Sequence, residues 1–398
     1  MAKFYASTRA NDALVGAGSR GGSRGQGYWR DLDWILLISG LALTILGSLL
    51  VWSASRADLA SDTDPQSYLK RHLINVAVAI ALGYLASRLN YRWLRAYTPI
   101  IYGISLLLLL LPFVPGIGVT VAGARAWIDL PGGLTLQPSE FTKIAVILMM
   151  AALLSERTDI EDEPSGRDFL MALGAAALPV AVILIQNDTG TVLIIGTVAI
   201  SMIAVAGVRS RWLVALIGGA VLSILFAIQL GLLKEYQVAR LTSFISPDQD
   251  MGASAYNANQ ARIAVGGGGW FGTGLFEGPQ TQGKFVPVNE SDFIFTVSGE
   301  ELGFLGSVLL ILLLAVIMWR AAMIAWKADD KYGRLVATGI LAWLAFQTFE
   351  NIGMTLGIMP ITGIPLPLVS SGGTSLMAVW IAIGLLQTVR LHEVRAAI

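Results

Sequence analysis

The sequence contains no cysteine, and its only histidines are His72 and His392. The chain therefore has no disulfides, thiolate metal ligands or cysteine nucleophile, and two histidines argue against a histidine-rich metal site or a histidine-based triad. Charged residues make up only 14% of the 398 residues, whereas soluble domains carry about a quarter. The 27 basic and 27 acidic residues balance, so no basic surface indicates a nucleic-acid partner.

Hydrophobic residues make up 55% of the chain, which predicts a polytopic membrane protein with an all-α fold. Ten apolar runs predict about ten transmembrane helices, because a helix needs roughly 20 apolar residues to cross a bilayer. A large external loop, residues 234–291, is expected between spans seven and eight. The runs are Trp34–Trp52, His72–Ala86, Ala96–Val114, Phe141–Leu154, Phe169–Gln186, Thr191–Val208, Trp212–Leu233, Leu302–Ala325, Leu335–Met359 and Ser375–Val389.

Residues 1–30 are rich in Gly, Ser and Arg and lack apolar periodicity, which predicts a disordered cytoplasmic tail before one membrane domain, residues 31–398. Ser53-Ala54-Ser55 resembles a signal-peptide cleavage site. The apolar run before it is too long, and the polar leader too extended, for a signal peptide. We therefore expect an uncleaved first span.

The distribution of basic residues predicts the orientation. Ten spans place both termini on one side, and if that side is inner, the inner segments hold 18 of the 27 Lys and Arg residues. The outer segments then hold eight, and Lys143 lies within a span. By the positive-inside rule both termini are cytoplasmic. The segments Val114–Gln137, Lys234–Ser291 and Thr362–Gly373 are then external, and the Pro- and Gly-rich third segment is expected to line a cavity or lie buried.

The segment Phe285–Gly303 joins the longest loop to a very apolar run, and it contains three carboxylates, Asp292, Glu300 and Glu301. Because acids are costly near hydrocarbon, a carboxylate at a bilayer edge is a candidate for function. The alternative is that Ser291 or Asp292 caps the following helix, and the two roles can coexist.

Glu140 and Lys143 are three residues apart at the start of a span, so they share one helical face and can form an ion pair. The pair could serve only to lock helices together, or Lys143 could present a cation to an anionic ligand. Arg71 and Arg125 are expected on the same outer face and could add to that positive field.

Other polar residues have structural explanations. Trp127 fits an interfacial aromatic belt, and Asp188 in Q-N-D-T-G-T fits a turn cap. Gln347 and Asn351 fit helix-to-helix hydrogen bonds within a span. Glu350 lies in the same span and is harder to explain in this way, because it is ionisable.

Two motifs do not predict a nucleotide site. Gly267–Gly272 matches G-x-G-x-x-G but has no βαβ unit around it, which favours a flexible or close-packed turn. Asp248-Gln249-Asp250 matches the D-x-D of nucleotide-sugar enzymes, but it is expected outside the cell, where solvated loop acids are the better interpretation.

Five ordered motifs resemble the SEDS family (shape, elongation, division and sporulation proteins) over all of the chain except the tail. They are G-A-R-A-W-I followed by Q-P-S-E-F-T-K, Q-N-D-T-G-T, G-G-W-F-G-T-G-L-F-E-G-P-Q-T-Q, S-D-F-I-F-T-V-S-G-E-E-L-G-F, and N-I-G-M-T-L-G-I-M-P-I-T-G-I-P-L-P-L-V-S-S-G-G-T-S. Within the family, P-I-T-G-I-P-L-P and G-L-F-E-G-P-Q-T-Q look like the elongation member RodA rather than the division member FtsW.

The resemblance implies a peptidoglycan glycosyltransferase that polymerises lipid II at the outer face of the bacterial cytoplasmic membrane, for cell elongation and shape. The implied partners are a class B penicillin-binding protein that cross-links the product, other elongation-complex proteins and membrane lipids. The family's essential external aspartate falls on Asp292, which is the expected catalytic residue. The expected substrate-binding residues are Lys143, Glu140, Trp127, Arg125, Arg71 and Ser371, and the expected supporting residues are Asp188, Gln280, Glu300 and Glu301.

The chain departs from the family pattern at four places. Ser291 replaces a frequent Thr, and Ala126 replaces a basic residue before the Trp, so Arg125 is shifted by one position. Ser371 stands in the S-Y-G-G motif where many members have Tyr, and Glu350 replaces an apolar residue. None of these departures changes Asp292.

The expected mechanism is inverting glycosyl transfer, in which Asp292 takes the proton from the attacking sugar hydroxyl. Lys143, Arg125 or a divalent cation, Mg or Mn, would stabilise the departing pyrophosphate. Two alternatives stay open: a lipid II flippase and a non-catalytic scaffold for a cell-wall synthase. Charged residues cluster outside, with Glu350 as the exception, and this favours the enzyme.

Overall fold

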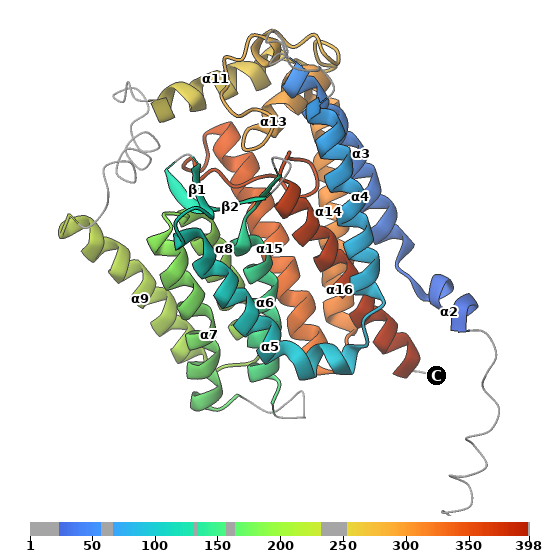
Figure 1. Cartoon of the computed structure of the whole chain (residues 1–398), viewed down its shortest axis with the longest axis vertical. Coiled ribbons are helices and arrows are strands. Elements are labelled where there is room, and N and C mark those ends of the chain that lie inside the picture. Colours follow the sequence, from blue (N-terminus) through green and yellow to red (C-terminus); the bar gives the residue numbers. More distant parts are fainter. Residues whose placement is uncertain are drawn as a thin grey trace, which may run out of the picture.

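The computed structural model describes residues 24–56, 67–121, 123–130, 134–156, 164–231 and 253–396, so the D-x-D motif at 248–250 lies outside the described residues. Each of the ten predicted spans falls on a long helix (Figure 1). These helices are α3 (Trp34–Arg56), α4 (Ser67–Ser87), α5 (Tyr91–Leu110), α6 (Pro138–Leu154), α7 (Gly166–Ile185), α8 (Thr189–Val205), α9 (Ser210–Gln229), α14 (Gly303–Lys327), α15 (Lys331–Leu356) and α16 (Gly373–Ala396).

Within the described ranges, seven helices are long and apolar enough to cross a membrane, and α8 and part of α9 are apolar but shorter. The mostly helical membrane fold is therefore confirmed, whereas the count of ten spans stays a prediction. The eighth predicted span starts earlier than expected, because α13 (Ile294–Val297) and the π-helical turn η3 (Ser298–Leu302) lead directly into α14.

The two ends of the bundle differ. The short helix α2 (Arg24–Asp31) and the C-terminal end lie at one end, and α11 (Ala253–Gly267), α13 and a small sheet lie at the other (Figure 1). The described parts of the segments predicted to be external therefore gather at one end, which we call the loop end. That this end faces the outside of the cell stays a prediction.

The helices α15 and α16 form the centre of the bundle. In their most apolar stretches 72% and 83% of the residues are buried, against 22% for α4. The helices α4 and α16 cross closely at Gly83 and Gly384, where a Cβ on Gly384 would lie 2.2 Å from the carbonyl oxygen of Gly83. Small residues permit such close approach between membrane helices.

Local sequence signals mark several helix ends. Ser165 and Asp168 form a capping box at the start of α7, and Asp330 caps α15 by accepting from the amide of Gly333. The helix α15 ends where Gly357 adopts φ +77°, a left-handed conformation that favours glycine. The chain then enters the irregular segment 358–372, which leads back to α16.

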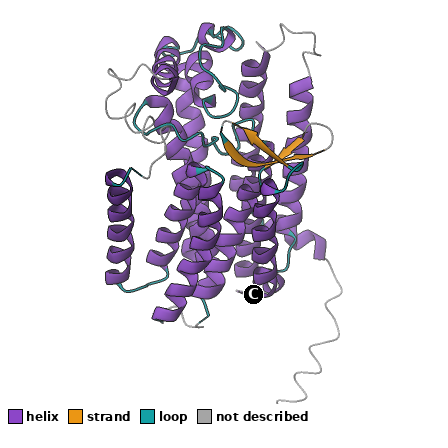
Figure 2. Cartoon of the chain, turned by 60° about the vertical axis from the view of Figure 1, so that its left-hand side comes forward, coloured by secondary structure: helices purple, strands orange, loops and turns teal. Residues whose placement is uncertain are grey.

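A small three-stranded antiparallel sheet, which was not predicted, accompanies the helices. It consists of β1 (Gly118–Val121), β2 (Ala124–Leu130) and β3 (Leu134–Leu136), in the order β1-β2-β3, and lies across the loop end (Figure 2). Val119 pairs with Trp127, and Ile128 pairs with Leu136. Short runs of β-branched and aromatic residues favour strands, but their pairing partners were not visible in the sequence.

The prediction of a disordered tail over residues 1–30 is wrong for residues 24–30, which form most of α2. Tyr28 is buried, and its hydroxyl lies 2.6 Å from the hydroxyl of Ser87. The guanidinium of Arg88 lies 4.5 Å from the centre of the Tyr28 ring. Residues 1–23 lie outside the described ranges, so the prediction stands untested there.

The glycine-rich part of the long loop is a close-packed turn, which is one of the two forms predicted for it. A Cβ on Gly268 would lie 1.9 Å from the carbonyl oxygen of Gly299, and one on Gly272 would lie 2.1 Å from that of Glu301. This turn therefore packs directly on η3, and only glycine permits that approach. The loop also contains two helices that were not predicted, α11 and α12 (Pro279–Gln282).

Candidate active site

Asp292 lies in a tight turn at the loop end, immediately before α13. The amides of Ser291 and Phe293 both donate to the carbonyl of Val288, at 3.2 and 3.4 Å. The residue that caps α13 is Phe293, and no side chain caps that helix. Asp292 is half-buried, and its Oδ1 accepts a hydrogen bond from the Ser291 hydroxyl at 2.9 Å. The helix-cap alternative is therefore wrong for this aspartate.

Asn351 connects this turn to segment 358–372. Its Nδ2 atom donates to the carbonyl of Asp292 and to the carbonyl of Ile364, both at 2.7 Å. Between these tethers lies Gly363, with φ +74°, and a Cβ at this position would lie 3.2 Å from Oδ2 of Asp292. The Asp292 carboxylate therefore lies against a backbone position that has no side chain.

The serines of the S-S-G-G motif reinforce the same junction. The Ser370 hydroxyl donates to the carbonyl of Ser291 at 2.6 Å and accepts from the amide of Leu366 at 2.7 Å. The amide of Ser371 donates to the carbonyl of Glu290 at 3.0 Å. The structure thus brings the predicted residue Ser371 to the Asp292 turn, and it adds Ser370, which sequence reasoning missed.

The helix α4 contributes one face to this junction. Tyr68, Arg71 and Asn75 are spaced three and four residues apart, so they share that face. The Tyr68 hydroxyl donates to the Ser371 hydroxyl at 3.1 Å, and a Cβ on Gly373 would lie 2.5 Å from the Asn75 amide nitrogen. Arg71 is exposed on the same helix face, between Tyr68 and Asn75 in the sequence.

Glu140 and Lys143 form the predicted ion pair, with 2.8 Å between Oε1 and Nζ and almost no exposure of either side chain. The ammonium also lies 4.6 Å from the centre of the Trp343 ring and donates to Oε1 of Gln347 at 3.4 Å. Gln347 donates in turn to the carbonyl of Pro365 at 2.7 Å. The pair and Gln347 therefore connect α6, α15 and segment 358–372.

The sheet carries two further predicted site residues, Arg125 and Trp127. The Arg125 guanidinium donates to the carbonyls of Pro112 and Phe113, at 2.9 and 3.4 Å. It therefore binds the segment that follows α5. Trp127 is half-buried on β2. The sheet is joined to the start of α16 because Thr374 donates to the carbonyl of Thr135 at 3.2 Å.

Three of the four residues predicted as supporting hold other parts of the loop end through their side chains, whereas Oε1 of Gln280 has no hydrogen-bond partner in the described part of the chain. Asp188 caps α8 through the amide of Thr191 at 3.1 Å. Glu300 accepts from the amides of Gln280 and Thr281 at the start of α12, at 2.7 and 2.8 Å. Glu301 accepts from the Ser53 hydroxyl of α3 at 2.6 Å. These contacts position loops, and none of them joins these side chains to Asp292.

Within the described ranges, no three His, Cys, Asp or Glu side chains gather in a way that could hold a metal ion. The predicted divalent cation would therefore need most of its ligands from a substrate, which is common for Mg²⁺. Asp292 is the carboxylate that could supply one ligand from the protein.

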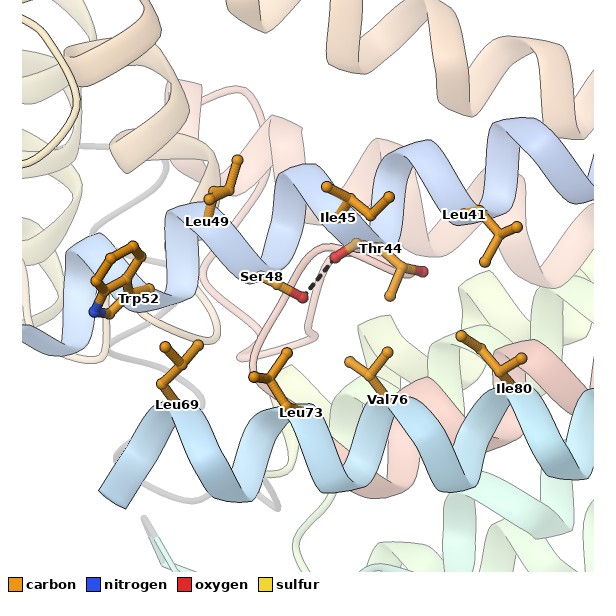
Figure 3. Close-up of a pocket in the computed structure, with 10 residues that line it drawn as sticks. All are labelled: Leu41, Thr44, Ile45, Ser48, Leu49, Trp52, Leu69, Leu73, Val76 and Ile80. Atoms are coloured by element: carbon orange, nitrogen blue, oxygen red, sulfur yellow. Dashed lines mark hydrogen bonds between the residues drawn. The ribbon is translucent and has the colours of Figure 1, made fainter. Parts of the chain in front are cut away.

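An apolar groove of about 310 Å³ runs between α3 and α4 (Figure 3). Side chains from both helices line it, among them Ile45, Leu49, Leu73 and Val76. At its loop end lies Trp52, whose ring centre is 4.8 Å from that of Phe276 in the long loop. The groove therefore begins beside the loop end and continues along two helices that can span a membrane.

Sequence comparison identifies relatives along the whole membrane domain. The family model for FtsW, RodA and SpoVE, described as cell cycle proteins, matches residues 33–395. The chain is 36% identical over 366 residues to the probable peptidoglycan glycosyltransferase FtsW of Trichlorobacter lovleyi, covering 89% of this chain and 92% of that protein. It is 36% identical over 365 residues to stage V sporulation protein E of Bacillus subtilis, covering 91% and 97%.

Solved structures share the fold. A chain from a study of a peptidoglycan synthase complex that coordinates polymerization and crosslinking has a TM-score of 0.74 at 28% identity, covering 91% of this chain and 98% of that one. Rod shape determining protein RodA of Thermus thermophilus has a TM-score of 0.64 at 29% identity, covering 91% and 96%. The names of the curated relatives lean towards FtsW, so they do not support the RodA-like prediction.

Proposed function

Because the chain belongs to the SEDS family of FtsW, RodA and SpoVE proteins, we propose that it is a peptidoglycan glycosyltransferase that polymerises lipid II. The observation that carries the proposal is the placement of Asp292. Its carboxylate is half-buried at the loop end, caps no helix, and lies beside Gly363 in a turn tethered by Asn351 and Ser370.

Asp292 acts as the general base. The 4-hydroxyl of the acceptor sugar attacks the anomeric carbon of the donor, the new C–O bond forms, and the bond to pyrophosphate breaks with its electron pair leaving on the pyrophosphate. The hydroxyl proton passes to the Asp292 carboxylate, and such a transfer is worth about 10²–10⁴-fold in rate. Ser291 orients the carboxylate through Oδ1, and the single displacement inverts the anomeric centre.

Arg71 is the residue that contacts the departing pyrophosphate. It is exposed on the face of α4 that also carries Tyr68, the side chain that contacts Ser371, whereas Lys143 is buried against Glu140 and Arg125 donates to backbone carbonyls. A cation placed where negative charge develops stabilises the transition state. In this proposal Lys143 and Glu140 support the site and do not contact the substrate. A divalent cation stays part of the proposal: Asp292 would supply one ligand to it, the cation would stabilise negative charge on the pyrophosphate, and no step depends on it.

The polyprenyl chain of the substrate lies along the groove between α3 and α4. The groove is lined by apolar side chains of two helices that can span a membrane, and its loop end adjoins Trp52 and the long loop. Burial of hydrocarbon against these side chains would hold the reacting head group at the loop end. This arrangement requires the loop end to face the outside of the cell, as the distribution of basic residues predicts.

A class B penicillin-binding protein is the proposed partner, supported by the structural neighbour from a synthase complex that couples polymerization to crosslinking. The cellular role is proposed as septal or spore wall synthesis, because the curated relatives are named FtsW and stage V sporulation protein E. The motif P-I-T-G-I-P-L-P favours the elongation role instead. Localisation of a fluorescent fusion at the septum or along the lateral wall separates these roles.

The test is polymerisation of lipid II by the purified protein, with and without its transpeptidase partner. We expect Asp292→Asn and Asp292→Ala to lower the rate by about 10³-fold, because each removes the base. The matched control is Asp129→Asn, which removes an exposed acid from β2 at the same end.

Normal polymerisation by the Asp292 variants would exclude this residue as the base. If the unmodified protein makes no polymer in either condition, while it moves lipid II between leaflets of a vesicle, the flippase alternative replaces the enzyme. If it does neither and only recruits an active synthase, the scaffold alternative is correct.

A further inference from the structure

Three side chains on one face of α15 hold segment 358–372 at three points. Asn351 donates to the carbonyl of Ile364 and Gln347 donates to the carbonyl of Pro365, both at 2.7 Å. At the third point the segment supplies the donor, because the Thr362 hydroxyl donates to Oε1 of Glu350 at 3.0 Å. Residues 362–365 are therefore fixed by α15, and they contain a proline and a glycine that make no regular helix or strand.

Glu350 is the unusual member of this set. It has 0% exposure, and its Oε2 has no hydrogen-bond partner in the described part of the chain. Burying a carboxyl group with one unpartnered oxygen is costly, and an apolar side chain would fill the same space at lower cost. The sequence therefore places a group here whose burial lowers stability. This indicates a role that depends on its hydrogen bond to Thr362.

The hydrogen bond between Glu350 and Thr362 acts one residue away from the base. Thr362 directly precedes Gly363, and the Cα atoms of neighbouring residues are about 3.8 Å apart. Gly363 is the position at which a Cβ would lie 3.2 Å from Oδ2 of Asp292. A shift of Thr362 would therefore move Gly363 against the Asp292 carboxylate, or away from it.

We propose that Glu350 is a positioning residue for the reaction at Asp292. Its carboxyl group holds the Thr362 hydroxyl, and this contact sets the place of Gly363 beside the base. The inference rests on the proposed glycosyl transfer. A misplacement of about 1 Å at a reacting group can cost up to about 10²-fold in rate, so a loose Gly363 would lower kcat and leave substrate binding intact.

The test measures kcat and KM of the full-length protein on lipid II, together with its thermal unfolding temperature. We expect Glu350→Leu and Thr362→Val each to lower kcat about tenfold with KM unchanged, because each removes one partner of the hydrogen bond. Glu350→Gln and Thr362→Ser keep an acceptor and a donor, so they should retain most of kcat. The matched control is Thr348→Val, which removes a buried hydroxyl on α15 that has no partner in the described residues.

The double variant Glu350→Leu/Thr362→Val decides whether the two residues act through one contact. We expect it to be no slower than either single variant, since the same hydrogen bond is lost in all three. Additive losses, or wild-type kcat in both single variants, would overturn the inference and leave the proposed function standing. A lower unfolding temperature with normal kcat would also overturn it, because Glu350 would then only stabilise the bundle. Absence of polymer from the unmodified protein would instead refute the proposed function.

Discussion

The two ends of the bundle treat buried carboxylates in different ways. At the end with α2, Asp33 is 1% exposed, and its Oδ2 lies 2.6 Å from a guanidinium nitrogen of Arg320 and 2.6 Å from one of Arg390. Gln387 donates to its carbonyl at 3.0 Å and accepts from its amide at 2.9 Å. At the loop end, Glu350 is just as buried, and its Oε1 accepts a hydrogen bond from the Thr362 hydroxyl at 3.0 Å.

The difference distinguishes a structural clamp, in which ion pairs to Asp33 hold helices together, from the proposed reaction site at Asp292. Two guanidinium groups and an amide side chain surround Asp33, so its charge is used to join α3, α14 and α16. Around Asp292, Asn351 holds the backbone carbonyl, the Ser291 hydroxyl donates to Oδ1, and a Cβ at Gly363 would lie 3.2 Å from Oδ2. A general base must be fixed in place and still accept a proton, and backbone tethers allow both.

The largest effect that sharpens this comparison is expected from Asp33→Asn. The change keeps the shape of the side chain but leaves two partly buried guanidinium groups without their shared anion. We expect the free energy of unfolding to fall by about 3 kcal/mol, because breaking a buried ion pair on one side is strongly destabilising. Thermal unfolding in detergent measures the loss. The kcat of the folded fraction should be normal, and a loss of kcat at normal stability would contradict the clamp.

The sequence predicted what depends on local pattern. The helices followed from apolar length, because a bilayer requires about 20 apolar residues per span. The Glu140–Lys143 pair followed from a spacing of three residues on a helix, and the structure confirms it. The caps of α8 and the close-packed glycine turn also followed from local rules.

The sequence did not predict contacts between distant segments. Asn351 bonds Asp292, 59 residues earlier, and nothing in the local pattern of a span identifies that partner. Gln347 and Asn351 are predicted to form helix-to-helix bonds. Gln347 makes one, because it accepts from Lys143 of α6 at 3.4 Å, but both residues also donate to carbonyls of segment 358–372, which the sequence did not indicate. Arg125 was expected to bind substrate, and the structure shows its guanidinium on the carbonyls of Pro112 and Phe113. A polar residue in a sequence shows what it can bind, whereas only the fold selects the partner.

Two glycines with nearly the same backbone conformation provide the next test. Gly363 has φ +74° beside Asp292, and Gly357 has φ +77° at the end of α15. Alanine at either position should cost about 1–2 kcal/mol of stability, because L-residues avoid this region. Only Gly363→Ala adds a Cβ at 3.2 Å from the Asp292 carboxylate, so only this variant should lower kcat, by about tenfold. Steady-state kinetics and thermal unfolding of both variants check this, and equal kcat values would contradict the assigned role of Gly363.

The smallest expected effect concerns the groove between α3 and α4, which links the loop end to the bilayer. Leu73→Trp should partly fill the groove and raise KM for lipid II roughly threefold, a change below 1 kcal/mol, with kcat unchanged. The matched control is Leu85→Trp, which enlarges an exposed side chain of the same helix outside the groove. If the polyprenyl chain occupies the groove, the KM difference should disappear with a lipid II analogue whose chain is too short to reach Leu73. A difference that persists with the short-chain analogue would mean that Leu73→Trp acts on the head-group site, and the groove would then have no part in holding the lipid.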